Sequence, residues 1–265
     1  MIIDSNSYLG RWGLRTKGIT KVEEFLKIMD KNKIDISVVT STVALVTDTK
    51  EGNLWLIKEI FPYLNRFIPV ACINPIWGLK ETMEYFDKYP FKIARISPSL
   101  HNYSLKDIVF LNPFMDLFKE ENIPLYITVE VCYNFCSIAN KMGFSPPIYP
   151  ISEIINFAEQ YSSQKIVICG YDTQLFSEVN NLLIPSFKKC KNLFIEISDI
   201  LVAGVIEKLV KEIPNQILLG TGNAINEPSG SIYKVKFAKI TDEEKEKILF
   251  RNAEKVFSSE NVIKK

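Results

Sequence analysis

The single histidine of the sequence, His101, is its clearest candidate for acid–base chemistry near neutral pH. An imidazole changes charge near neutral pH, which suits a general acid or base. His101 stands in the polar stretch 97–103, directly after the apolar run 92–96. We therefore predict a catalytic role for His101, with a hydrogen-bonded loop histidine as the alternative.

Arg95 is the second candidate, because it places a charge inside the otherwise apolar run 92–96. A charge within a buried strand needs a partner of opposite charge or a ligand. An arginine can hold a carboxylate or phosphate through forked hydrogen bonds. The alternative is an internal salt bridge to Glu196, an acid in a later apolar run, or to Asp4. Because side chains alternate along a strand, Arg95 shares its face with Ser97.

Further polar side chains follow the apolar runs, where parallel strands of a barrel open into their loops. That end of a barrel is where its enzymes bind substrates. We predict that the following residues line a ligand site: Asp4, Asn6, Tyr8, Tyr126, Thr128, Glu196 and Asn223. Asp172 and Asp199 also follow such runs, and each suits either a base at the site or a helix N-cap.

Eight short apolar runs position these polar stretches. The runs start near positions 2, 34, 67, 92, 125, 165, 193 and 217, and a spacing of about 30 residues is the size of one βα repeat. Amphipathic helical patterns lie between them. This alternation predicts an α/β fold, a (β/α)8 TIM barrel made by one domain over residues 1–265. An open doubly wound sheet is the rival, but no glycine-rich nucleotide-binding loop follows any run.

Three details of this barrel can be predicted. The first strand is expected at 2–4, with a loop over 6–18. Pro113 is expected in the first turn of a helix at 113–120, where proline is tolerated. A last helix over 241–257 begins with a capping box. We expect this helix to pack one apolar face on the barrel near the first strand, through Ile248, Leu249, Ala253 and Val256.

Four segments resemble the metal-dependent amidohydrolase superfamily, in particular its amidohydrolase-2, decarboxylase-like branch. Residues 1–10 look like that family's opening strand, and 93–103 look like its fourth strand and loop. Residues 165–198 look like its sixth and seventh strands, and 217–257 look like its ending. The resemblance implies the barrel fold and a hydrolase or decarboxylase reaction at a divalent metal.

The metal ligands that this resemblance implies are missing from the sequence. The His-x-His pair of the family's first strand falls on Asn6 and Tyr8. The later histidines fall near 126–128 and on Gly170, and the aspartate falls on Gly222. A catalytic metal needs about three nitrogen, sulfur or carboxylate ligands, which one histidine cannot rebuild. We therefore predict no metal and no other cofactor.

The composition argues against several classes of partner. The 32 Lys+Arg and 31 Asp+Glu leave a net charge of +1, which gives no reason to expect nucleic acid or an acidic membrane surface. No apolar run approaches the ~20 residues of a membrane helix. Five cysteines without a secretory signal favour reduced thiols and a cytoplasmic protein. The expected partner is a small molecule, and a homo-oligomer stays open.

Two functions follow from these observations. The first is an amidohydrolase-like barrel that binds a small polar or anionic metabolite and hydrolyses or cleaves it without metal. Arg95 would orient that substrate, and His101 would act as acid or base. The second is a catalytically inactive pseudoenzyme, serving as a ligand-binding or complex-forming subunit. A polar cavity with paired charges would favour the first, and a mouth plugged by Tyr8, Tyr126 and Tyr171 would favour the second.

Overall fold

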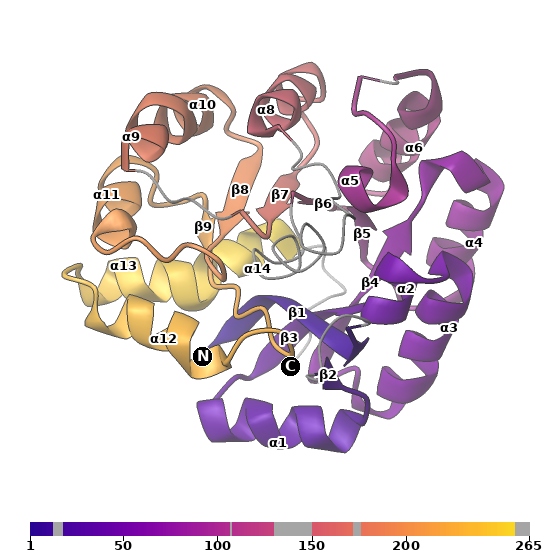
Figure 1. Cartoon of the computed structure of the whole chain (residues 1–265), viewed down its shortest axis with the longest axis horizontal. Coiled ribbons are helices and arrows are strands. Elements are labelled where there is room, and N and C mark those ends of the chain that lie inside the picture. The colour runs from indigo at the N-terminus through magenta and orange to yellow at the C-terminus, as the bar shows by residue number, and fades with distance from the viewer. Residues whose placement is uncertain (13–17, 107, 130–149, 172–175, 258–265) are drawn as a thin grey trace, which may run out of the picture.

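All eight apolar runs form strands of one curled sheet. The computed structural model describes residues 1–12, 18–106, 108–129, 150–171 and 176–257. The strands are β1 (Ile3–Arg11), β3 (Ile36–Ser41), β4 (Phe67–Ile73), β5 (Ile93–Ile96), β6 (Leu125–Thr128), β7 (Ile166–Cys169), β8 (Leu193–Glu196) and β9 (Ile217–Leu218). Each pairs in parallel with the next in this order, and helices surround them (Figure 1). The predicted α/β fold is confirmed.

The first strand is longer than predicted, so the expected loop over 6–18 is wrong in its first half. β1 runs to Arg11, and β2 (Gly18–Ile19) pairs antiparallel with its end. Polar residues can stay in this strand because protein groups satisfy them. The hydroxyl of Ser7, for example, lies 2.9 Å from both the Ser37 hydroxyl and the Val38 carbonyl. Hydrogen bonding in the buried interior, rather than apolarity, extends β1.

β1 also contacts the segment that follows β9, which forms a seam between the first and last parts of the sheet. A parallel bridge joins Ser7 to Asn223. Three backbone N–H groups donate across the seam: Ser5 to the Leu219 carbonyl, Gly222 to that of Asn6, and Tyr8 to that of Asn223. The segment 219–223 therefore lies on the side of β1 opposite to β3.

The helices broadly follow the predicted order. They are α1 (Val22–Asn32), α2 (Thr42–Val46), α3 (Thr49–Ile60), α4 (Leu79–Lys88), α5 (Pro98–His101), α6 (Ile108–Glu120), α8 (Ile151–Gln160), α9 (Phe176–Glu178), α10 (Ile184–Lys189), α11 (Val205–Glu212), α12 (Pro228–Phe237), α13 (Asp242–Glu246) and α14 (Asn252–Phe257). Short helical turns are η1 (Phe61–Tyr63), η2 (Pro75–Trp77), η3 (Val179–Leu183) and η4 (Lys247–Arg251). Pro113 lies inside α6, not in its first turn as predicted. No helix in the described parts of the chain is long and apolar enough to cross a membrane.

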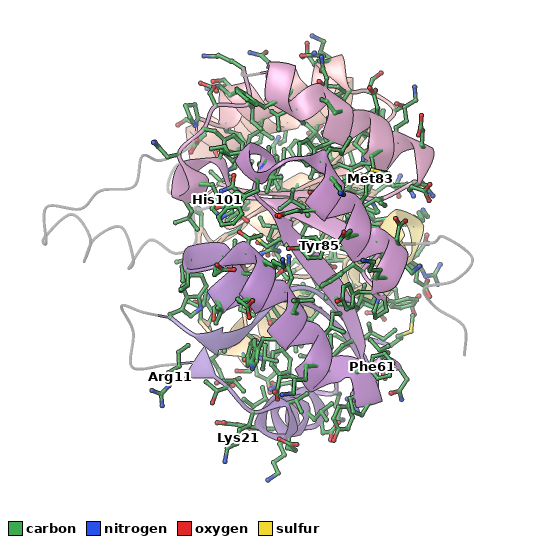
Figure 2. All side chains as sticks on the ribbon, turned by 90° about the vertical axis from the view of Figure 1, so that its right-hand side faces the viewer. Arg11, Lys21, Phe61, Met83, Tyr85 and His101 are labelled. Atoms are coloured by element: carbon green, nitrogen blue, oxygen red, sulfur yellow. The ribbon has the colours of Figure 1, made fainter. Side chains whose placement is uncertain are left out.

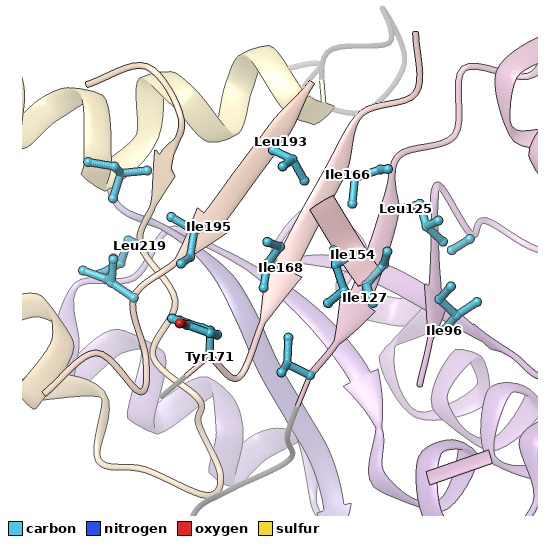
Figure 3. Close-up of a cluster of buried hydrophobic side chains, with 14 of the residues drawn as sticks. Ile96, Leu125, Ile127, Ile154, Ile166, Ile168, Tyr171, Leu193, Ile195 and Leu219 are labelled. Carbon is cyan, nitrogen blue, oxygen red and sulfur yellow. The ribbon is translucent and has the colours of Figure 1, made fainter. Parts of the chain in front are cut away.

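The outer face of the sheet packs against the helices. Figure 3 shows Ile127, Ile168 and Ile195 projecting from neighbouring strands into one cluster with Ile154 of α8. All four side chains are fully buried, and burial of such a side chain stabilises a fold by about 1.5–3 kcal/mol. These positions alternate with inward-facing ones, so helix packing fixes which side chains point into the interior.

The amino-terminal end of the sheet interior is apolar and is closed by α14. We call the inward residues Ile3, Val70, Ile93, Val167 and Leu218 the lower layer. Ala253, Val256 and Phe257 of α14 pack against this layer. The predicted capping box at Thr241 and Glu244 starts α13. Ile248 is buried as expected, whereas Leu249 is only half-buried.

Candidate functional site

A buried cation lies above the lower layer. The side chain of Arg95 on β5 is fully buried. Its Nη2 donates to Asn6 Oδ1 at 2.7 Å, and Asn6 Nδ2 donates to Glu196 Oε1 at 3.1 Å. We call Arg95, Asn6 and Glu196 the Arg95 centre. The Asn6 amide relays between a positive charge on β5 and an acid on β8.

This relay replaces the direct salt bridge that was one sequence-based alternative. No ion pair among the described residues includes Arg95. Instead, the rings of Tyr8 and Tyr126 have their centroids 5.2 and 5.1 Å from Arg95 Cζ. Aromatic faces at this distance attract a cation, most strongly when water is excluded. The guanidinium is therefore held by an amide, two rings and the sulfur of Cys169, which lies 3.6 Å from Nη2.

Glu196 is held by backbone and hydroxyl donors. Its carboxylate accepts the N–H of Gly170 at 2.8 Å, the N–H of Ser198 at 2.7 Å and the Ser198 hydroxyl at 2.9 Å. Burial raises the pKa of Glu196, with a smaller contribution from the nearby Asp199 carboxylate, while those N–H donors act in the opposite direction. A Cβ on Gly220 would lie 1.9 Å from Glu196 Oε2, so only glycine leaves room for this carboxylate.

The Asp4 side chain joins β1 to the segment 219–223 rather than pairing with Arg95. Its Oδ1 accepts the N–H groups of Thr221 and Asn6, at 2.9 and 3.2 Å. Its Oδ2 accepts the hydroxyls of Thr221 and Ser37, at 2.6 and 3.4 Å. Burial raises the pKa of Asp4 to about 7, against the opposing effect of the Thr221 hydrogen bonds. Protein donors thus occupy both oxygens of a residue that the sequence suggested for ligand binding.

Several buried polar atoms at this end of the sheet lack a hydrogen-bond partner among the described residues. They include Arg95 Nε and Nη1, Asn223 Nδ2, and the hydroxyls of Thr40, Ser97 and Thr128. Ser97 is two residues beyond Arg95, and Thr128 is two beyond Tyr126 on the adjacent β6, so these hydroxyls follow on the same inward face. An unsatisfied buried group costs about 1–3 kcal/mol, and such groups commonly hold water or ligand.

Thr40 and Ser97 were not among the predicted site residues. Their signal in the sequence was present: each is a polar residue at the end of a buried run, in phase with the inward positions. Thr128 and Asn223 were predicted, and their unpartnered groups agree with a place in a polar site. The Ser198 hydroxyl lies 2.9 Å from both Glu196 Oε1 and Asp199 Oδ2, so the two carboxylates share its one proton, and Asp199 accepts the Asn226 amide. Asp172 lies outside the described residues.

An apolar mouth cluster lies on the carboxyl side of Arg95. Its members are Tyr8, Trp12, Ala44, Leu45, Cys72 and Ile225, with Leu100 packed against them. The Tyr8 and Trp12 rings meet edge to face with centroids 5.4 Å apart. Tyr126 and Tyr171 are also buried. In the described part of the chain only Tyr8 belongs to the mouth cluster, because Tyr126 packs with the lower layer and Tyr171 with the helix-facing cluster, so the three tyrosines do not form one plug of the mouth.

His101 lies apart from the Arg95 centre. Its Nε2 is 3.1 Å from the Leu45 carbonyl oxygen, which can only accept, so Nε2 carries the proton. Burial lowers the pKa of His101, partly offset by the Leu45 and Ile73 carbonyls. The imidazole lines a cavity of about 380 Å³ between α2, η2 and α5, which we call the α2–α5 pocket. Figure 2 shows His101 on the side of the molecule that carries these elements. The structure therefore does not bring His101 and Arg95 into contact.

The residues at the implied metal position do not fit a divalent metal. Asn6 is engaged with Arg95 and Glu196, and neither Gly170 nor Gly222 has a side chain. A guanidinium 2.7 Å from Asn6 Oδ1 already places a positive charge where a metal would bind. No group of three or more His, Cys, Asp or Glu residues in the described segments could hold a metal ion. Absence of a bound metal stays a prediction.

Solved structures share this fold over nearly the whole chain. A 5-carboxyvanillate decarboxylase from Novosphingobium aromaticivorans, with bound manganese and a nitrobenzoic acid, matches with a TM-score of 0.76 at 14% identity, over 97% of each chain. A 2,6-dihydroxybenzoate decarboxylase from Rhizobium matches with a TM-score of 0.71 at 12% identity, over 97% of this chain and 98% of that one. A candidate amidohydrolase from Staphylococcus aureus matches with a TM-score of 0.69 at 18% identity, over 97% and 99%.

The likeness is one of fold. No protein-family model matches the sequence, and no curated protein matches it. The structural neighbours nevertheless confirm an α/β fold with a curled parallel sheet, like that of the amidohydrolase-2 decarboxylases. Fold alone does not transfer a reaction, so function has to be argued from the residues of the site.

Proposed function

We propose that this amidohydrolase-type barrel binds a small carboxylate metabolite at the Arg95 centre without a metal. The observation that carries the proposal is the buried guanidinium, whose Nε and Nη1 have no partner in the described residues. A cation removed from water gains strongly from an anion, because the surrounding protein screens charge poorly. The Asn6 relay engages only Nη2, so two nitrogens remain for a ligand.

The neighbouring structures support a carboxylate as the ligand class. By their names, the two decarboxylases act on aromatic carboxylates. An arginine can hold a carboxylate through charge-assisted hydrogen bonds without any metal. Since Nη2 donates to Asn6, the carboxylate would accept from Nε or from Nη1 rather than from the fork predicted from the sequence, and the hydroxyls of Ser97 and Thr128 supply further donors.

The mouth cluster must open for such a ligand to reach Arg95. Trp12, Leu45, Leu100 and Ile225 come from the segments that follow β1, β3, β5 and β9. Loops at this end of a barrel often open and close around ligands. We propose that they exclude water from the bound carboxylate, which strengthens its attraction to Arg95.

We also infer that the sheet closes into the complete (β/α)8 barrel, formed by residues 1–265 as one domain. The seam between β1 and the segment 219–223 supports this inference, since three backbone hydrogen bonds and the Asp4–Thr221 contacts join the two. Closure would hold Asn6, Arg95 and Glu196 from three different strands in fixed positions, as a preformed ligand site requires.

A catalytically inactive pseudoenzyme is the second candidate. It is favoured by the position of His101, which contacts the Leu45 carbonyl rather than Arg95. Without the imidazole of His101 beside the bound carboxylate, the acid or base predicted for the reaction is missing, and ligand binding would not lead to turnover. In this alternative the protein binds the ligand at the same site but catalyses no reaction.

Isothermal titration calorimetry with benzoate, 2,6-dihydroxybenzoate and citrate tests the proposal. We expect at least one acid to bind the wild type. Arg95→Lys should bind it about 10–100-fold more weakly, because charge-assisted hydrogen bonds worth about 1.5–3 kcal/mol are lost. Arg11→Lys, at an exposed site, is the matched control and should bind normally. Thr128→Val serves as a second variant where Arg95→Lys does not fold.

Equal binding by wild type, Arg95→Lys and Thr128→Val would reject Arg95 as the anchor. Carbon dioxide release from the bound acid separates the two candidates, because only an active barrel would produce it. Elemental analysis of the purified protein checks metal independence. One tightly bound metal per chain would contradict the metal-free proposal.

A further inference from the structure

The α2–α5 pocket lies in a different position from the Arg95 centre and has a different chemical character. It opens between the segments that follow β3, β4 and β5, at the end of a barrel where ligands bind. Leu45 and Leu100 form apolar walls that also belong to the mouth cluster. The two regions are therefore separated by shared apolar side chains and present different groups to a ligand.

The pocket carries no net charge. None of the described residues that line it is Lys, Arg, Asp or Glu. Burial lowers the pKa of His101, so its imidazole is uncharged at neutral pH. The nearby Asp48 carboxylate is engaged as the N-cap of α3, accepting the N–H of Glu51 at 2.8 Å. A charged ligand would lose hydration here without meeting an opposite charge.

The pocket has the surfaces that an aromatic ring needs. Trp77 is 57% exposed and lines the cavity from η2. That turn is fixed by Asn74, whose Oδ1 accepts the N–H of Ile76 at 3.2 Å, so the indole sits on a capped segment. Indole faces favour offset stacking with other rings. Asn102 and His101 add polar groups to the wall, and a cavity of about 380 Å³ lies within the usual range for small-molecule sites.

We propose that the α2–α5 pocket binds an uncharged molecule of one or two aromatic rings, which stacks on Trp77 and hydrogen-bonds to the polar wall. This site takes a neutral ring, whereas the Arg95 centre takes a carboxylate. The two ligand classes differ in charge, so each can be titrated without the other.

The only histidine of the chain makes the test direct, because one imidazole resonance reports on the pocket. Proton NMR of the whole protein would follow the His101 signal during titration with nicotinamide and with phenol. Nicotinate and benzoate are the matched anions. We expect both neutral compounds to shift the signal in wild type and in Arg95→Lys, and the anions to leave it unmoved in Arg95→Lys.

Trp77→Ala should weaken the neutral ligands roughly two- to tenfold, since stacking contributes about 0.5–1.5 kcal/mol. Phe237→Ala is the control, because Phe237 is 80% exposed on α12, outside the pocket lining. It should bind as the wild type does. Unaltered affinity in Trp77→Ala, or no shift with millimolar nicotinamide and phenol, would overturn the inference.

The result also separates this inference from the proposed function. Loss of benzoate binding in Arg95→Lys with a retained nicotinamide shift supports two independent sites. A nicotinamide shift without any carboxylate binding would reject the proposed function and leave this pocket standing. Loss of both ligands in a folded Arg95→Lys protein would reject the separate pocket, and Thr128→Val repeats the comparison if Arg95→Lys does not fold.

Discussion

The lower layer and the Arg95 centre are neighbouring levels of the same sheet interior, yet they are held together by different forces. On β5, Ile93 belongs to the lower layer and Arg95 to the centre. On β9, Leu218 packs in the lower layer, and Gly220 two residues later leaves space for Glu196. Successive inward-facing residues of one strand are two positions apart, so an apolar packed residue is followed directly by a hydrogen-bonded charged one.

The two kinds of interior lose stability in different ways when a side chain is removed. An apolar layer loses free energy roughly in proportion to the volume removed. A buried polar network loses more free energy when one member is removed, because the remaining charge or donor is left unpaired and out of contact with water. The lower layer, closed by α14, therefore stabilises the fold, whereas the Arg95 centre keeps donors that have no partner among the described residues and can serve a ligand or water.

The largest expected effect is that of Arg95→Ala. Removing the guanidinium leaves Glu196 buried without its relayed partner and opens a cavity between two rings. We expect a loss of about 3–5 kcal/mol in the free energy of unfolding. Ile93→Val, on the same strand, should cost only about 0.5–1.5 kcal/mol. Urea denaturation of both variants measures the difference.

A double variant sharpens that test. Arg95→Met combined with Glu196→Gln removes both charges while keeping most of the volume, so stability should recover towards the wild-type value. If the double variant were as unstable as Arg95→Ala, packing rather than charge would explain the loss. The comparison between the two interiors would then fail.

The second effect concerns Asp4, whose pKa is raised from 3.8 to about 7 by burial. Between these values the folded protein keeps the proton that the unfolded chain releases, so stability falls as pH rises from about 4 to 7. The fall can reach roughly 4 kcal/mol, at about 1.4 kcal/mol per pH unit. Below pH 3.8 the carboxyl is protonated in both states, and above about 7 the full cost is present.

Asp4→Asn isolates this dependence, because an amide has no proton to release. Between about pH 4 and 7, the urea midpoint of the wild type should fall with rising pH while that of Asp4→Asn does not. Outside this range the two midpoints should change with pH in the same way. Parallel curves from pH 4 to 8 would show that Asp4 is already ionised in the folded protein.

The fold was easier to predict than the site, and the reason is physical. Alternating apolar runs and amphipathic stripes act locally, so eight strands and the capping box at Thr241 could be recognised in the sequence. The length of β1 could not, because partners from residues distant in the sequence, such as Ser37, satisfy its polar side chains. Local polarity alone therefore indicated a loop.

The partners of the site residues were likewise not predictable from the local sequence. The buried charge of Arg95 was evident from its run, but its partner was not, because an amide on β1 stands between two charges that a pairwise argument would join directly. His101 and Arg95 were predicted to act on one substrate, Arg95 from within the run 92–96 and His101 from the polar stretch that follows it. The short helix α5 turns His101 towards the Leu45 carbonyl instead.

A smaller effect is expected for Leu249, which lies at the edge of the helix face that was predicted to pack on the barrel. A fully buried leucine costs about 2–5 kcal/mol when truncated to alanine. Leu249 is only half-buried, so Leu249→Ala should cost about 1–2 kcal/mol. Leu201→Ala, at a side chain that is 75% exposed, should change stability by no more than about 0.5 kcal/mol. A cost for Leu249→Ala equal to that of Leu201→Ala would remove Leu249 from the packed face.

The smallest effect is the most informative about the Arg95 centre. The Thr128 hydroxyl is buried and has no partner in the described residues, so Thr128→Val replaces it with a methyl group of similar size. Without ligand, stability should stay within about 0.5 kcal/mol of wild type or rise slightly, because no protein hydrogen bond is lost. Thr221→Val is the matched control. Its hydroxyl donates to Asp4 and accepts the Asn223 N–H, so its loss should cost about 1–3 kcal/mol.

Thermal unfolding with and without the best-binding acid completes the argument. If Thr128 helps to bind a carboxylate, wild type gains stability from the acid by mass action, and Thr128→Val gains less despite an unchanged or higher starting stability. A structural hydroxyl would show the opposite combination, with a lower starting stability and the same gain from the acid. Because the two roles move the two measurements in opposite directions, this one substitution decides whether the unsatisfied donors serve a ligand.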